Sequence, residues 1–302
     1  MTDKRTGDMR WGVRRRLEFI DFRLFWDGRF NRKDLSDTFG ISAQQASADI
    51  ALYTAEAPQN LVYDGGARAY LRTPDYKPTL MQASSERYLL QLVAIENRWM
   101  SKEDTWFDDE PPIENVSLLR KRTDSAILLR ILDVIGRRGQ LEIRYKSITG
   151  SPETRRVIAP HALFHAGGRW YLRAWSSEHR DFRDYNLFRI EHAGAIEPTS
   201  ADPALDYEWS HRIELEIGPN PALSQDQRAA IAMEYGMTDE RLVVTTRLSQ
   251  SFYIMTENNL DVEPGTLVPG KQQLVLLNRA EVVAARATAR KLSTSAVARG
   301  SV

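Results

Sequence analysis

Residues 31–52 read NRKDLSDTFGISAQQASADIAL, and this stretch decides the fold of the N-terminal region. Asn31 can cap a short helix over residues 32–39, and Gly40 stands where a left-handed residue commonly closes a helix. Ser42 can cap the next helix, which runs through Leu52. The stretch therefore predicts two helices joined by a short turn.

The flanking segments complete a larger motif. Apolar residues recur at close to helical spacing over residues 11–26, which predicts a preceding helix. Two extended runs, residues 61–63 and 67–71, surround an Asp-Gly-Gly turn that requires positive φ, as in a β-hairpin. Three helices and a hairpin predict a winged helix-turn-helix domain over residues 1–80.

The second helix of a helix-turn-helix lies in the DNA major groove with its N-terminal residues toward the bases. Those residues are small or polar and uncharged: Ser42, Ala43, Gln44, Gln45, Ser47 and Ala48. Glutamine can pair with adenine through two hydrogen bonds, and short alanines let the helix approach closely. We expect this face to read DNA sequence; the alternative is a polar helix surface that simply faces solvent.

Basic residues surround this helix and can contact phosphates. They are Arg10, Arg14, Arg15, Arg16, Arg32 and Lys33, together with Arg68 on the hairpin, which could reach the backbone or the minor groove. Such contacts set affinity and register, not sequence choice. Any one of them could equally be a surface charge without a contact.

Downstream, the pattern predicts an α+β multidomain chain. Residues 81–136 are expected to form a helical connector, with helices over 84–100 and 116–135. Alternating runs then predict a small β-rich domain over 137–200, followed by an α+β domain over 201–285. The last residues, 286–302, are rich in Ala, Arg and Ser and are expected to be disordered.

The run RWYLRAW at residues 169–175 is the most informative downstream strand. Side chains alternate between faces, so Leu172 and Ala174 point one way, while Tyr171 and Arg173 point the other. The basic and aromatic face can stack a base and hold a phosphate, as nucleotide and single-strand sites do. The alternative is a solvated sheet face on which arginine stems cover the aromatic rings.

A family resemblance rests on this strand and its surroundings. Trp170-Tyr171-Leu172, the upstream run over 156–160, Gly168 and the downstream Phe188-Arg189-Ile190 fall at the spacing of WYL-domain regulators. With the winged helix and the C-terminal extension, the chain resembles in particular the CapW and BrxR group of repressors associated with bacterial anti-phage defence. The resemblance implies an Sm-like WYL domain and a C-terminal dimerisation (WCX-like) domain.

The same resemblance implies a homodimer that binds an inverted-repeat operator in double-stranded DNA and is released by a nucleic-acid or nucleotide ligand. Together with Arg173 on the basic face, the implied ligand-binding residues are Tyr145, Arg156, His161, Tyr171, Arg183 and Arg189. Asn186 and Phe188 depart from the family pattern, which more often has arginine and aspartate there.

Three of these residues have a structural alternative. A lone histidine such as His161 near a strand start is more often structural than a ligand donor. Arg183 and Arg189 could instead form ion pairs with neighbouring carboxylates, at Asp181, Asp184 or Glu191.

Composition limits the other function classes. Residues 1–33 carry ten Lys/Arg against five Asp/Glu, whereas residues 202–286 carry seven against thirteen, so a basic front and an acidic rear suit a protein that presents one end to phosphates. With no cysteine and five scattered histidines, neither a metal site nor a cofactor is expected. Apolar runs are too short for a membrane span, so we expect the protein to be located in the cytoplasm.

Catalytic motifs are missing from the sequence: we find no phosphate-cradling glycine loop and no nucleophile elbow, so we do not expect an enzyme. The leading interpretation is a dimeric transcriptional repressor. An activator of the same architecture, or a module that binds another protein through the basic and aromatic strand face, remain as alternatives.

Overall fold

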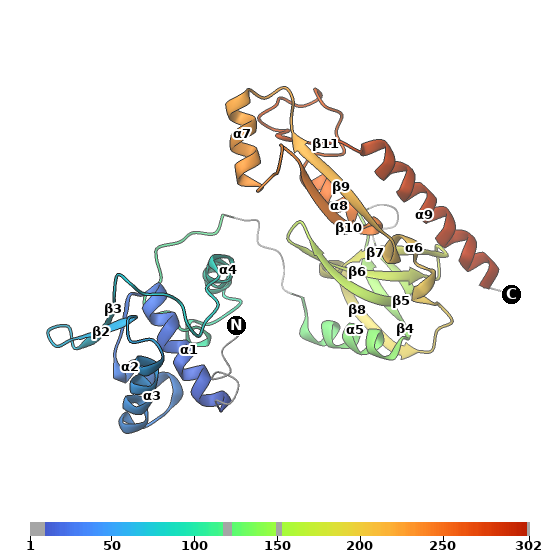
Figure 1. Cartoon of the computed structure of the whole chain (residues 1–302). Helices are drawn as coiled ribbons and strands as arrows, with labels where there is room; N and C mark the ends of the chain where they lie inside the picture. The colour runs from blue at the N-terminus through green and yellow to red at the C-terminus, as the bar shows by residue number, and fades with distance from the viewer. Residues whose placement is uncertain (1–9, 117–122, 149–152, 301–302) are drawn as a thin grey trace. The chain divides into compact units, whose positions relative to one another are not determined.

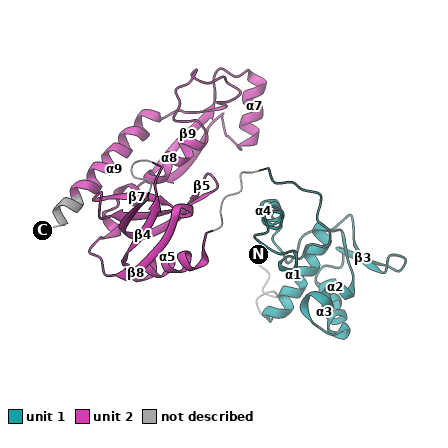
Figure 2. Cartoon of the chain, turned by 180° about the vertical axis from the view of Figure 1, so that it is seen from behind, with its two compact units in different colours: residues 1–118 teal, residues 119–302 magenta. Residues whose placement is uncertain are grey.

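The computed structural model describes residues 10–116, 123–148 and 153–300. The chain divides into two compact units, residues 1–118 and 119–302, which Figure 2 shows in different colours. No helix among the described residues combines the length and the apolar character needed to cross a membrane.

Unit 1 is a winged helix-turn-helix, as the sequence predicts (Figure 1). Its three strands form an antiparallel sheet in the order β1-β3-β2. In chain order its elements are α1 (Trp11–Trp26), β1 (Arg29–Phe30), α2 (Arg32–Phe39), α3 (Ala43–Glu56), β2 (Leu61–Asp64), β3 (Ala69–Arg72) and α4 (Ser85–Glu96), followed by a short 3-10 turn η2 (Lys102–Asp104).

Local sequence signals set the ends of these helices. The Asn31 side chain accepts hydrogen bonds from the backbone N–H groups of Lys33 and Asp34, and the Asp34 side chain accepts one from the Asn31 backbone in return. Gly40 ends α2 with φ of 61°, a conformation that favours glycine. Ser42 then caps α3 by accepting from the Gln45 N–H. The predicted helix, turn and helix are therefore confirmed.

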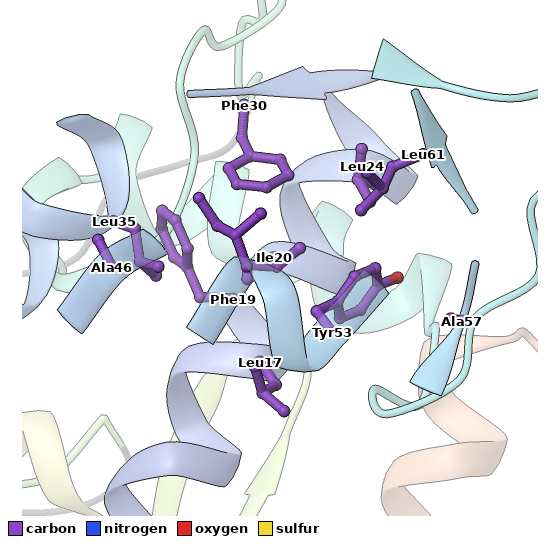
Figure 3. Packing of buried hydrophobic residues seen from close by; sticks show 11 residues of the cluster. Leu17, Phe19, Ile20, Leu24, Phe30, Leu35, Ala46, Tyr53, Ala57 and Leu61 are labelled. Carbon is purple, nitrogen blue, oxygen red and sulfur yellow. The ribbon is translucent and has the colours of Figure 1, made fainter. Parts of the chain in front are cut away.

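The core of unit 1 lies where α1, α2, α3 and the sheet meet (Figure 3). Fully buried side chains include Leu17, Ile20, Leu35 and Tyr53. Asp21 is buried among them and accepts hydrogen bonds from Tyr53 Oη (2.5 Å) and Tyr76 Oη (2.8 Å), and from the backbone N–H groups of residues 79–81. This carboxylate ties the segment after the hairpin to α1, which fixes the base of the wing.

Unit 2 begins with α5 (Ser125–Arg137), which packs on a five-stranded antiparallel sheet in the order β7-β6-β5-β4-β8. Ile131 and Val134 of α5 join Leu141, Ile143 and Leu172 of the sheet in one buried core. The strands are β4 (Gln140–Lys146), β5 (Glu153–Ala166), β6 (Arg169–Ser176), β7 (Asp181–Asn186) and β8 (Ile190–Glu197), with a 3-10 turn η3 (Leu187–Arg189) before β8.

The last part of unit 2 is the expected α+β region. Its sheet, in the order β10-β9-β11, forms a second core with α7, α8 and α9. The elements are η4 (Pro203–Leu205), α6 (Tyr207–Ser210), β9 (Arg212–Pro219), α7 (Gln225–Glu234), β10 (Leu242–Arg247), α8 (Leu248–Glu257), β11 (Leu274–Leu276) and α9 (Arg279–Gly300).

Two expectations about organisation need correction. The expected connector over 81–136 is divided: α4 belongs to unit 1, whereas α5 contributes to the core of unit 2. The helix expected over 116–135 is α5, which begins only at Ser125; residues 117–122 lie outside the described residues.

The expected disordered tail over 286–302 is instead helical through Gly300, as part of α9. Val282 and Ala289 of this helix are buried, and Ser293 accepts a hydrogen bond from the backbone N–H of Tyr207. Alanine-rich composition favours a helix once one face has a partner to pack against, and α6 and α8 supply that partner (Figure 1). Residues 301 and 302 lie outside the described residues.

Candidate nucleic-acid interface and ligand site

The first turn of α3 presents an exposed polar surface. Ala46, Asp49 and Ile50 are buried on the inner face of the helix. The other residues at the start of the helix are exposed: Ser42, Ala43, Gln44, Gln45, Ser47 and Ala48. The residues predicted to read bases are thus brought together on one accessible surface.

A groove of about 620 Å³ runs between this surface and the wing. Four of the predicted contacts, Arg32, Lys33, Ser47 and Arg68, line it together. Arg32 Nη1 donates to Ser47 Oγ at 3.4 Å, so the start of α2 touches α3 inside the groove. The sequence interpretation missed the other polar lining residues, Asn31, Ser36, Tyr63 and Tyr70; only the hairpin assignment could have pointed to the two tyrosines.

Arg68 has φ of 52° at the tip of the wing, next to the turn in which Asp64 Oδ1 accepts from the backbone N–H groups of Gly66 and Ala67. The turn therefore holds the hairpin closed and leaves the Arg68 side chain exposed. A guanidinium in this position, beside Lys33 at the groove, gives the surface a positive charge.

Arg14 and Arg15 lie elsewhere in unit 1. Both form ion pairs with Glu18, at 3.1 Å and 3.4 Å, and the Arg15 guanidinium lies 4.0 Å from the centre of the Trp106 ring. They line a separate cavity of about 310 Å³ bounded by α1 and α4. The structure does not bring these two predicted contacts to the groove.

Arg16, also expected to contact a phosphate, instead forms an ion pair with Asp49 of α3 at 2.6 Å. Its side chain is only 15% exposed. This is a correction to the expectation, and its cause is a carboxylate 33 residues away that the helical pattern of α1 does not reveal.

In unit 2, β6 alternates as expected. Leu172 and Ala174 lie in the core beneath α5, and Tyr171 and Arg173 point to the other face. That second face is not open, however, because Phe164 stacks on Tyr171 at 5.1 Å and Tyr253 of α8 lies 4.7 Å from the same ring. The expected base-stacking surface is covered by the chain's own C-terminal part.

Arg173 is 3% exposed and is held by three carboxylates. Its Nε and Nη2 donate to the two oxygens of Asp206 at 2.7 Å and 2.8 Å, Nη1 donates to Asp184 at 3.2 Å, and Nη2 also donates to Glu208 at 3.2 Å. Burial alone would lower the pKa of Arg173, but the bonds to Asp206 and the charges of Asp184 and Glu208 raise it. This arginine is neutralised within the protein and is not available to an anionic ligand.

His161 belongs to the same cluster. Its Nε2 lies 3.0 Å from Asp206 Oδ2, and its ring meets Phe182 and Trp209 edge to face. Burial alone would raise the pKa of Asp206, but the hydrogen bonds from Arg173 and His161 lower it, so this carboxylate stays ionised. The arrangement corresponds to the structural alternative for His161.

A second group of polar side chains lies on the face of the sheet that α5 covers. Arg156 pairs with Ile143, and Arg183 pairs with Ala174, across neighbouring strands. Both arginines therefore point to the same face as these two core residues. Arg156 donates to Glu178 at 3.0 Å, lies 2.6 Å from His179 Nε2, and sits 6.0 Å from the centre of the buried Tyr145 ring. Arg183 is exposed and has no ion-pair partner among the residues that the structure describes.

The Tyr185 hydroxyl is buried beside this group, next to the side chains of Ser176 and Arg156. Burial raises its pKa, so the hydroxyl keeps its proton and can donate it. Burial lowers the pKa of His179, and the positive charges of Arg183 and Arg156 lower it further. Together, Arg156, Arg183, His179 and Tyr185 offer positive charge and a buried hydroxyl.

Arg189 ends η3 and is half buried, with no ion-pair partner in the ranges covered by the structure. The carboxylates expected to pair with Arg183 or Arg189 have other partners: Asp181 pairs with Arg290, Asp184 with Arg173, and Glu191 with Arg144. Asn186 has a local function, since its side chain caps η3 by accepting from the Phe188 N–H.

Comparison with known proteins agrees with this architecture. Family models match residues 12–94 as the BrxR transcriptional regulator winged helix-turn-helix domain, residues 126–194 as a WYL domain, and residues 212–282 as the BrxR transcriptional regulator C-terminal dimerization domain. The DNA-binding transcriptional repressor CapW of Stenotrophomonas maltophilia is 35% identical over 285 residues, which cover 93% of this chain and 95% of that protein.

The chain belongs to the CapW family of DNA-binding transcriptional repressors. Within this family, CapW of Pseudomonas aeruginosa is 35% identical over 93% of this chain and 94% of its own length. CapW of Escherichia coli strain KTE188 is 34% identical over 91% and 92%, respectively. The resemblance stated from the sequence is thereby confirmed, and the three matched domains correspond to the winged helix, the five-stranded sheet with α5, and the sheet around β9.

Proposed function

We propose that this chain is a sequence-specific DNA-binding repressor that reads its operator with the first turn of α3 and holds it with the adjacent groove and wing. The observation that carries the proposal is the exposed start of α3, which carries Gln44 and Gln45 and contributes Ala43 and Ser47 to the groove that Arg32 and Arg68 also line. Exposed amides on a capped helix suit base edges, and guanidinium groups at its flanks suit phosphates.

Each group has its own part in this proposal. Gln44 and Gln45 contact base edges, and Ser42 and Ser47 contact either a base or a phosphate. Arg32 at the start of α2 binds the DNA backbone, and Arg68 on the wing binds the backbone or the minor groove. A helix of this kind enters the groove by its N-terminus, which is the end of α3 that carries the exposed residues.

The protein acts as a homodimer, in which the C-terminal domain joins two chains. Support comes from the family model for residues 212–282, which describes a dimerization domain. Two winged domains related by a two-fold axis require an inverted-repeat operator, with half-sites separated by about 10 base pairs or a multiple of that.

The WYL domain senses an anionic ligand, a nucleotide or a short nucleic acid, and ligand binding relieves repression of a phage-defence operon. The group formed by Arg156, Arg183, His179 and Tyr185 supports this step, because it combines positive charge with a buried hydroxyl. Arg173 has no part in it, since three carboxylates already occupy its guanidinium.

A gel-shift experiment tests the DNA-reading surface. The full-length chain is titrated against its own upstream DNA and against a scrambled duplex of equal length. We expect the double variant Gln44→Ala/Gln45→Ala to lose the preference for the upstream DNA. As the matched control, Arg14→Ala/Arg15→Ala removes two polar side chains outside the groove and should keep the preference, with any loss of affinity equal for both duplexes. Unchanged preference in the glutamine variant would overturn the assignment.

A second experiment tests ligand sensing with mononucleotides and short oligonucleotides as probes. The wild-type chain on its operator is expected to release DNA with one of these probes. Arg183→Gln should bind the operator as the wild type does yet lose the release. If every probe leaves the wild-type complex intact, the ligand assignment fails; a reporter gene behind the operator separates repression from activation.

A further inference from the structure

An exposed glutamine of α3 donates a hydrogen bond to a buried carboxylate. Asp49 is 2% exposed, and its Oδ1 accepts a hydrogen bond from Gln45 Nε2 at 3.0 Å. The two residues stand one helical turn apart, so their side chains lie on the same side of α3. By contrast, the neighbouring Gln44 is exposed and has no hydrogen-bond partner among the described residues.

Asp49 is itself fixed from α1. Arg16 Nε donates to Asp49 Oδ2 at 2.6 Å, and Arg16 Nη2 donates to Oδ1 at 3.3 Å. The carboxylate is therefore paired with a guanidinium and cannot turn away from Gln45 without breaking this two-point contact. Arg16, Asp49 and Gln45 form a chain of contacts that leads from α1 to the predicted DNA-reading surface; we call it the Arg16–Asp49–Gln45 relay.

The chemistry of the relay fixes the orientation of the Gln45 amide. A carboxylate only accepts hydrogen bonds, so the NH₂ group of the amide must face Asp49 and the Oε1 atom must face away. One N–H remains free after the bond to Asp49. The groups left for DNA are thus one acceptor, Oε1, and one donor, the second N–H.

An adjacent donor and acceptor match one base better than the others. Adenine presents an acceptor, N7, and a donor, the N6 amino group, in the major groove, whereas guanine presents two acceptors, N7 and O6. An amide held in this orientation can satisfy both groups of adenine, but its Oε1 would face guanine O6. Because Asp49 holds one N–H, Nε2 cannot offer both of its N–H groups to the two acceptors of guanine. Turning the amide over would place Oε1 against the Asp49 carboxylate, which repels it.

We propose that Asp49 is a positioning residue that orients Gln45 to read adenine, and to reject guanine, at one position of each operator half-site. The proposal rests on the proposed function, because it assumes that α3 enters the major groove. Beyond the proposed function, it names adenine as the base that Gln45 selects and Asp49 as the buried residue that orients Gln45.

The experiment measures base preference at each operator position. The operator is selected from randomised duplexes with the full-length wild-type chain, and the dissociation constants of all single-base variants are then measured at one salt concentration. We expect one position per half-site to prefer adenine over guanine by about tenfold or more. Gln45→Ala should abolish that preference and so identify the position, whereas Gln44→Ala should leave it in place.

The decisive variant is Asp49→Asn, whose amide can either donate or accept and so no longer dictates how Gln45 is turned. We expect its preference for adenine at the Gln45 position to fall to within about twofold, while preferences at other positions stay as in the wild type. In the Gln45→Ala background, Asp49→Asn should not change base preference any further. Replacing that adenine by 7-deazaadenine, which lacks the N7 acceptor, should weaken wild-type binding and leave Asp49→Asn unaffected.

Because Asp49→Asn leaves the Arg16 guanidinium without its charged partner, a folding defect must be separated from loss of orientation. The variant Arg16→Met/Asp49→Leu replaces the buried pair by apolar side chains of similar size and keeps α1 against α3. It should fold, bind nonspecific DNA as the wild type does, and show the same loss of adenine preference.

The outcomes are distinct. An unchanged adenine preference in Asp49→Asn overturns the relay and leaves the proposed function intact. If Asp49→Asn weakens binding to all sequences equally, also in the Gln45→Ala background, then Asp49 has only a structural function, and the relay is overturned as well. If the wild-type chain selects no sequence at all, the proposed function itself fails.

Discussion

Arg173 and Asp206, 33 residues apart, form a two-point ion pair in which Nε and Nη2 of the guanidinium bind the two carboxylate oxygens at 2.7 Å and 2.8 Å. Asp206 is fully buried and Arg173 almost fully. Asp206 lies in the segment before β9, and Arg173 lies in β6. The pair therefore connects the WYL sheet to the C-terminal part of unit 2. Its geometry predicts a contribution to folding and none to ligand binding.

Asp206→Asn should destabilise unit 2 by roughly 3 to 5 kcal/mol, because it leaves the buried guanidinium of Arg173 without its main partner. Urea denaturation followed by tryptophan fluorescence measures the effect. Arg183→Gln is the matched control, since Arg183 is exposed and has no ion-pair partner in the described ranges; its free energy of unfolding should stay within about 0.5 kcal/mol of the wild type. Equal stability of the two variants would show that the Arg173–Asp206 pair does not stabilise unit 2.

Gly40→Ala should destabilise unit 1 by about 1 kcal/mol. A Cβ atom at this position would meet no atom within 4 Å, so the cost comes only from φ of 61°. Gly136→Ala is the matched control: its Cβ also meets nothing, but Gly136 lies inside α5. There the same change should stabilise unit 2 by roughly 0.5 to 1 kcal/mol. Stabilisation by both substitutions would show that α2 does not end in the left-handed conformation.

Lower pH should stabilise unit 1 through Asp27. Burial raises the pKa of Asp27 from its ordinary value of 3.8 to about 6, although the Arg23 partner opposes the change. Between these two values the folded state binds a proton that the unfolded state does not, so the free energy of unfolding rises as pH falls from 7 toward 4. The gain is on the order of 2 kcal/mol.

The measurement for Asp27 is urea denaturation at several pH values, for the wild type and for Asp27→Asn. The variant cannot titrate at this position and should lack this part of the pH dependence. A wild-type curve and a variant curve that run parallel between pH 4 and 7 would refute the assignment to Asp27.

His179 should titrate below its ordinary pKa of 6.5 in the free protein, since burial and the charges of Arg183 and Arg156 disfavour its protonated form. Arg183→Gln removes one of these positive charges and should raise the pKa of His179. Binding of an anionic ligand at the same group should raise it too. NMR titration of the histidine ring protons measures all three states, and a pKa that does not respond to Arg183→Gln would place His179 outside the group.

Local signals allowed much of the fold to be predicted from the sequence. The ends of α2 and α3 follow from Asn31, Gly40 and Ser42, each of which acts within a few residues of itself. The alternation of β6 likewise predicted that Leu172 lies in the core.

The partners of charged residues could not be predicted in this way. Arg16 finds its carboxylate on α3, and Arg173 finds its main partner beyond the end of the WYL sheet. A long-range ion pair leaves no periodic signal, so the sequence pattern predicts that both arginines contact ligands, whereas in the structure both bind the protein's own carboxylates. The helix α9 could not be predicted for a related reason: only the burial of its Val282 and Ala289 distinguishes it from a disordered tail of the same composition.

The central claim is that α3 and the wing select one DNA sequence, and equilibrium binding of the full-length wild-type chain tests it most directly. Fluorescence anisotropy gives the dissociation constants for the upstream operator and for a scrambled duplex of the same length and composition at one physiological salt concentration. We predict that the operator binds at least about 10³-fold more tightly. Equal affinity for the two duplexes would contradict the account.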